Sequence, residues 1–189
     1  MCWIAEGRWA LLAALFISTA SAQVENRAKA CAACHGPDGN SVTAGTPSLA
    51  GQPKLFLENY LVMTREGLRG NDVMQGLLKG VPDGEIVALS KYFSALPARP
   101  APVSIDKTLF QKGRETAAKN RCGSCHLPDF RGREQMPRLA GQREEFLAEV
   151  MLQYRQNRRP GGDTMMSAAL YGIPEADFRA LAHYFSRLK

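Results

Sequence analysis

The chain lacks the features that mark membrane-spanning, nucleic-acid-binding and disulfide-rich proteins. Beyond residue 17, no apolar run is long enough to form a transmembrane helix. The formal net charge of +6 is not gathered into long lysine and arginine runs, which argues against binding to nucleic acid. Only five of the 189 residues are cysteine, and four of these form two Cys-x-x-Cys pairs. This pattern is typical of a binding site and not of a disulfide framework.

The N-terminus has the pattern of an export signal. Arg8 precedes an apolar run over residues 9–17, and the small residues Ala20, Ser21 and Ala22 follow. We therefore predict a signal peptide over residues 1–22, cleavage after Ala22, and a mature protein in the periplasm that does not span the membrane. An uncleaved signal that acts as an anchor is the alternative, because Glu6 offsets the charge of Arg8.

The rest of the chain is an internal repeat. Four blocks of the first half recur in the second half in the same order, displaced by 90 to 92 residues. One- and two-residue differences between the displacements are what loop insertions in a duplicated domain produce. The paired blocks are 31–35 with 122–126, 47–52 with 137–142, 74–82 with 166–174, and 91–94 with 183–186.

The repeat predicts two tandem all-α domains. We place them at residues 23–97 and 105–189, joined by a proline-rich linker over residues 98–104, because closely spaced prolines prevent a continuous helix. Apolar residues at helical spacing indicate the helices, and the Gly-, Pro- and Ser-rich stretches between them predict loops and no strands. The expected helices cover residues 23–33, 54–66, 83–96, 105–121, 143–155 and 174–188.

The sequence Cys31-Ala-Ala-Cys34-His35 recurs as Cys122-Gly-Ser-Cys125-His126. Cys-x-x-Cys-His is the attachment signature of haem c, in which both sulfurs bond to the porphyrin and the histidine binds the iron. A zinc site is less consistent, because each pair lies in its own module. A redox dithiol of thioredoxin type needs a βαβ context that the pattern lacks. We therefore predict two covalently bound haem c groups, with His35 and His126 as iron ligands.

The second axial ligand can be sought by symmetry. Met74 and Met166 occupy corresponding places, each eight residues before the proline that opens the last helix of its module. A thioether opposite an imidazole favours the reduced iron and suits electron transfer. Met165 competes with Met166 in the second module. His183 corresponds to Lys91, and we expect it at the surface and not as a ligand.

The paired Pro-x-Leu-Ala-Gly-Gln blocks lie between the histidine and the methionine of each module. The carbonyl of Pro47 or Pro137 could accept the imidazole Nδ1 proton and make the ring more electron-donating. A tight turn that packs against haem is the equal alternative.

Together these motifs resemble the dihaem cytochromes c of the cytochrome c4 type, which consist of two class I cytochrome c domains. The likeness covers nearly the whole mature chain, through the Cys-x-x-Cys-His, Pro-x-Leu-Ala-Gly-Gln and methionine blocks. The second half departs from it with 127–130 Leu-Pro-Asp-Phe where the first has 36–39 Gly-Pro-Asp-Gly. The resemblance implies histidine and methionine ligation in both halves and domains that face each other near their haem propionates.

The favoured function is a soluble electron carrier and not an enzyme. It would accept electrons from a donor dehydrogenase or quinol-oxidising complex and pass them to a terminal oxidase or another acceptor. The alternative is an electron-accepting subunit bound to a dehydrogenase. An enzyme or gas sensor with one open iron site is a third hypothesis, against which the matched methionines argue.

Overall fold

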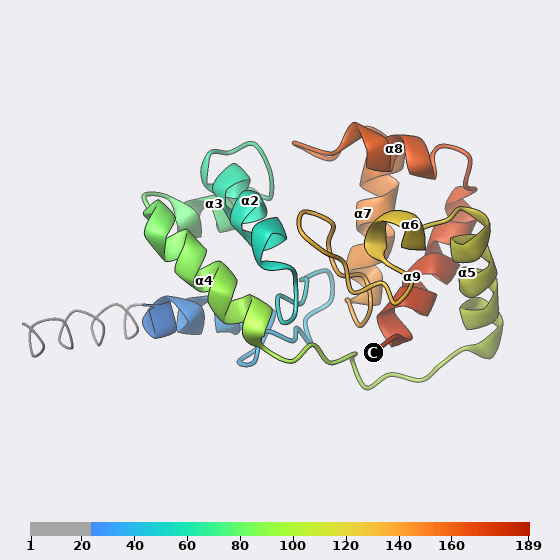
Figure 1. Cartoon of the computed structure of the whole chain (residues 1–189), viewed down its shortest axis with the longest axis horizontal. Helices are drawn as coiled ribbons and strands as arrows, with labels where there is room; N and C mark the ends of the chain where they lie inside the picture. The colour runs from blue at the N-terminus through green and yellow to red at the C-terminus, as the bar shows by residue number, and fades with distance from the viewer. Residues whose placement is uncertain (1–23) are drawn as a thin grey trace, which may run out of the picture.

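The computed structural model of the chain describes residues 24–189, and all of its regular elements are helical apart from one isolated bridge between Arg133 and Met136 (Figure 1). The predicted signal peptide over residues 1–22 and its cleavage after Ala22 lie outside the described residues. Within residues 24–189, no helix is both long and apolar enough to cross a bilayer.

The first half begins with a helix over residues 24–35, followed by α2 (Lys54–Arg65), α3 (Asp72–Leu78) and α4 (Asp83–Ala95). Leu57, Leu89 and Phe93 form one buried cluster with Ala28 of the first helix. A second cluster joins Leu78 of α3 to Val81 of the following turn and Ile86 of α4. The helix that ends in the first Cys-x-x-Cys-His motif is therefore held against α2 and α4 by apolar burial.

The second half contains α5 (Lys107–Lys119), α6 (Gly123–His126), α7 (Glu144–Arg155), α8 (Thr164–Leu170), the 3₁₀ turn η1 (Glu175–Asp177) and α9 (Phe178–Arg187). One apolar cluster joins α5, α7, α8 and α9. Phe130 of the loop after α6 enters this cluster and contacts the ring of Phe185 at 4.8 Å between centroids. The loop that follows the second motif is thus anchored to the last helix.

The all-α fold and its division into two tandem domains are confirmed, and each predicted helix has a counterpart within a few residues. Residues 96–106 join α4 to α5 without a helix, and the olive-green segment runs along one edge of the molecule in Figure 1. In the second half the predicted helix over 105–121 corresponds to α5, which ends at Lys119. Arg121, with a positive φ of 53°, lies between α5 and the short helix α6. The domain boundaries at residues 97 and 105 remain predictions.

Two short helices, α3 and α8, replace segments that were expected to be loops. Each has only seven residues, too few to display a clear apolar period. Their start signals are the capping residues Asn71 and Asp163, whose side chains accept hydrogen bonds from the backbone N–H groups of Met74 and Met165. These capping residues are the sequence signal from which both helices could have been predicted.

His183 is buried, and the expectation that it lies at the surface was wrong. Only 4% of the residue is exposed. Its Nε2 accepts a hydrogen bond from the backbone N–H of Asp106 at 3.0 Å, and its Nδ1 lies 3.1 Å from a carboxylate oxygen of Glu144. The segment before α5 covers this part of α9, a long-range contact that position on the helix alone does not reveal. Both ring nitrogens are engaged, which agrees with the expectation that His183 is not an iron ligand.

The crossing of α5 and α9 depends on Gly113. A Cβ atom on this residue would lie 2.1 Å from the carbonyl oxygen of Ala180 and 2.6 Å from the Cβ of Tyr184. We expect Gly113→Ala to lower the free energy of unfolding of the second half by about 1–3 kcal/mol, because overpacking outweighs the gain in helix propensity. Guanidinium unfolding measures this change.

Gly84→Ala in α4 is the matched control for Gly113→Ala. No atom lies within 4 Å of the Cβ that it would add. The control should be neutral or stabilising by up to about 1 kcal/mol. An unchanged unfolding midpoint for Gly113→Ala would show that the two helices separate without cost.

Candidate functional site

The two cysteine pairs occupy equivalent positions with equivalent exposure. Cys31 and Cys122, the first of each pair, are half-buried, whereas Cys34 and Cys125 are exposed, and none of the four forms a disulfide. Burial raises the pKa of Cys31 and of Cys122 above the ordinary value. A reactive redox dithiol needs a thiol with a lowered pKa, so this environment argues against thioredoxin-like chemistry.

The two motif histidines are fixed by the same contact in both halves. His35 and His126 are 5% and 8% exposed. Their Nδ1 atoms lie 2.7 Å from the carbonyl oxygen of Pro47 and 2.9 Å from that of Pro137, respectively. Of the two alternatives that the sequence left open, the structure therefore shows the hydrogen bond between each imidazole and a proline carbonyl.

This contact determines the state of each ring. A carbonyl oxygen can only accept, so Nδ1 must carry the hydrogen and Nε2 has the free lone pair. Burial lowers the pKa of both histidines, and the hydrogen bond to proline raises it by a smaller amount. The two imidazoles are thus held neutral, with the nitrogen that can bind a metal left unprotonated.

Identical backbone bonds anchor the proline segments. The backbone N–H groups of Leu49 and Ala50 both donate to the carbonyl of Gly39, at 2.8 and 3.0 Å, and Leu139 and Ala140 donate in the same way to Phe130. Gly51 donates to the carbonyl of Phe93 at the end of α4, and residue 141 makes the matching bond to α9. Each proline carbonyl is therefore positioned from two sides.

The departures at residues 127–130 change side chains but keep the backbone conformation. Leu127 and Phe130 have positive φ angles of 69° and 57°, where Gly36 and Gly39 have 86° and 73°. A positive φ costs a non-glycine residue about 1–3 kcal/mol, and at Leu127, where ψ is 157°, the conformation is one that glycine almost alone adopts. Burial of the Phe130 ring among the aromatic residues of α9 offsets that cost in the second half.

Met74 and Met166 are each the third residue of a short helix, and both are half-buried against the core of their half. Met165 is 72% exposed, and Val73, its counterpart in the first half, is 70% exposed. The position before the paired methionine therefore points to solvent in both halves. Burial thus favours Met166 over Met165 as the partner of Met74.

The family model described as cytochrome c matches residues 22–93 and again residues 110–189. The chain is also 30% identical to the cytochrome c4 of Pseudomonas aeruginosa, over 86% of this chain and 85% of that protein.

The chain belongs to the dihaem cytochromes c of the c4 type.

Two further comparisons agree with this membership. The crystal structure of reduced recombinant cytochrome c4 from Pseudomonas stutzeri matches with a TM-score of 0.80 and 27% identity, covering 88% of this chain and 97% of that one. The thiosulfate dehydrogenase electron acceptor of Thiomonas intermedia is 29% identical over 94% of this chain and 88% of that protein. This cytochrome c is thus a dihaem electron-transfer protein that binds two haem c groups covalently.

The residues of this cytochrome fit that cofactor. Each half offers two cysteines outside any disulfide, a neutral buried imidazole and a half-buried thioether, the donor set of a His/Met-ligated haem c. Between residues 24 and 189, no group of three or more His, Cys, Asp and Glu residues is arranged to hold a metal ion. The donor set of each half therefore suits an iron porphyrin better than a bare metal ion.

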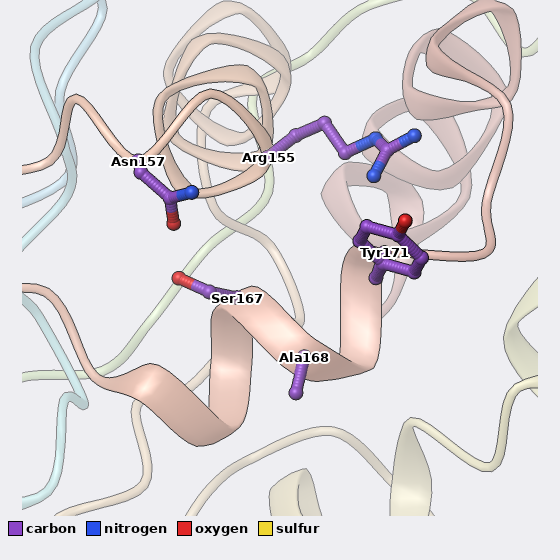
Figure 2. Close-up of a pocket in the computed structure, with 5 residues that line it drawn as sticks. All are labelled: Arg155, Asn157, Ser167, Ala168 and Tyr171. Atoms are coloured by element: carbon purple, nitrogen blue, oxygen red, sulfur yellow. The ribbon is translucent and has the colours of Figure 1, made fainter.

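A depression lies between the end of α7 and α8 (Figure 2). None of its lining residues belongs to either Cys-x-x-Cys-His motif. The Arg155 guanidinium lies over the Tyr171 ring at 4.9 Å from its centroid, and Asn157 and Ser167 line the other side. Its remaining lining residue is Ala168, and the lining contains no His, Cys, Lys, Asp or Glu.

Proposed function

We propose that this cytochrome is a periplasmic electron carrier, exported by a signal over residues 1–22. It would take electrons from a donor dehydrogenase or quinol-oxidising complex and deliver them to a terminal oxidase or another acceptor. It would catalyse no bond-making reaction. Its modules are residues 23–97 and 105–189, with residues 98–104 as the linker.

The proposal assigns each haem to the residues of one half. Cys31 and Cys34 hold haem 1 covalently, with His35 and Met74 as the iron ligands. In the second half, Cys122 and Cys125 hold haem 2 in the same way. The iron ligands of haem 2 are His126 and Met166.

The observation that carries the proposal is that each half supplies two side chains suited to bind a haem iron. A neutral histidine with a free Nε2 and a half-buried methionine on a capped helix occur in each module. A bound haem would supply the one-electron couple between ferric and ferrous iron. If the histidine and the methionine of each half both bind the iron, no coordination site would remain for a substrate, and the part of the protein would be to hold the haem while electrons enter and leave.

Carbon monoxide tests this arrangement. We expect the ferric protein to show a methionine-to-iron absorption band and the reduced protein to bind no carbon monoxide at either haem. Visible spectroscopy before and after addition of the gas measures both. Uptake of one carbon monoxide per chain would instead support an enzyme or gas sensor with one open iron site.

A second candidate is supported by the match to the thiosulfate dehydrogenase electron acceptor of Thiomonas intermedia. In that case the chain would be the electron-accepting subunit of a dehydrogenase. Purification of the native protein under mild conditions distinguishes the two. A free carrier should elute as a single chain type, whereas a subunit should retain a larger catalytic chain.

A further inference from the structure

Gln52 and Gln142 are buried at the junction of the two halves. They end the paired Pro-x-Leu-Ala-Gly-Gln segments, and only 4% and 5% of the two residues are exposed. The loops that contain these segments face each other between the halves (Figure 1). A buried amide side chain is costly unless its polar atoms are bonded, so their partners matter.

Each glutamine binds the backbone of the opposite module through both ends of its amide. Gln142 Oε1 accepts from the N–H of Ser48 at 2.7 Å, and its Nε2 donates to the Ser48 carbonyl at 2.9 Å. Gln52 makes the same two bonds to Arg138, both at 3.0 Å. Ser48 and Arg138 are equivalent residues of the repeat, so the contact is reciprocal.

The peptide groups bound in this way are the ones that hold the histidines. The N–H of Ser48 and the carbonyl of Pro47 belong to a single peptide unit, and that carbonyl accepts from His35 Nδ1. A peptide that donates through its N–H becomes a stronger acceptor at its oxygen. A stronger acceptor at Nδ1 makes the imidazole a better electron donor at Nε2. The peptide between Pro137 and Arg138 connects Gln52 to His126 in the same way.

We propose that Gln52 and Gln142 are positioning residues that each tune the haem of the opposite module. Gln142 lowers the reduction potential of haem 1 through Ser48, Pro47 and His35, and Gln52 lowers that of haem 2 through Arg138, Pro137 and His126. This inference rests on the proposed ligation of the irons by His35 and His126. Docking of the two modules then sets both potentials, because each module completes the ligand support of the other.

The test is a crossed pair of variants, Gln142→Leu and Gln52→Leu. Leucine fills a similar volume but cannot accept from the peptide N–H. For Gln142→Leu we expect the equilibrium constant for reduction of haem 1 to rise about 2- to 10-fold, the range for loss of one hydrogen bond, while haem 2 is unchanged. Gln52→Leu should do the reverse. A redox titration followed by proton NMR reads each haem separately.

A second NMR measurement follows the bond itself. In the ferrous holoprotein, the chemical shift of the His35 Nδ1 proton should change in the direction of a weaker hydrogen bond in Gln142→Leu. It should not change in Gln52→Leu. A purely structural role in docking predicts equal changes at both haems from either variant, and that result would overturn the inference. Unchanged potentials in both variants would overturn it as well.

The NMR spectrum of the wild-type protein distinguishes a failure of this inference from a failure of the proposed function. If His35 and His126 bind iron, the porphyrin ring current shifts their ring protons strongly. Absence of those shifts would contradict the ligand assignment itself. Their presence together with unaltered potentials in the glutamine variants would contradict only the tuning role.

Discussion

Replacement of both Cys122 and Cys125 by serine is expected to leave one haem per chain instead of two. The two Cys-x-x-Cys-His motifs lie in separate halves, each with its own buried cluster, and no cysteine is shared between them. Haem bonding at Cys31 and Cys34 should therefore continue. Intact-mass measurement of the exported protein counts the haems, and the haem absorbance per chain should fall by about half.

The matched control is the same double replacement of Cys31 and Cys34, which should remove haem 1 and keep haem 2. Single replacements of the exposed Cys34 or Cys125 keep one bond between sulfur and haem. They keep the prediction testable if a double variant fails to fold. Loss of both haems from either double variant would show that the modules mature together. The wild-type mass also tests whether the chain begins at Gln23.

Met166→Ala is expected to open haem 2 to carbon monoxide, with uptake rising from none to one molecule per chain. Removal of the thioether leaves one axial position of the iron free and lowers the potential of that haem, because methionine ligation favours the ferrous state. Half-burial of Met166 against the core of the second half places it for this role. A carbon monoxide difference spectrum of the reduced variant measures the uptake.

Met165→Ala is the control next to it on the same helix. Because Met165 is 72% exposed, its removal should leave the spectrum, the carbon monoxide uptake and the potential unchanged. Met74→Ala should reproduce the Met166→Ala result at haem 1. If Met165→Ala alone opens haem 2, the ligand assignment in the second half is wrong.

The sequence by itself predicted the two haems, the two modules and the long helices of this protein. Covalent attachment of haem needs a short local motif, so two copies of Cys-x-x-Cys-His indicate two haems without knowledge of the fold. The constant displacement of the blocks indicates two equivalent modules, and helical spacing located the long helices because an apolar face recurs every three or four residues. The paired Pro-x-Leu-Ala-Gly-Gln blocks left two interpretations equal, a proline carbonyl that accepts from the histidine and a tight turn that packs against haem, and the sequence alone did not decide between them.

Only the tertiary structure decided the features that depend on contacts between distant segments. It showed that the two methionines proposed as iron ligands lie on the short helices α3 and α8, that Met166 is half-buried while Met165 faces solvent, and that His183 is covered by the segment before α5. It also revealed the crossed bonds of Gln52 and Gln142. A local pattern specifies which residues can bond to a haem or begin a helix, whereas burial and contacts across the module boundary depend on how the whole chain packs.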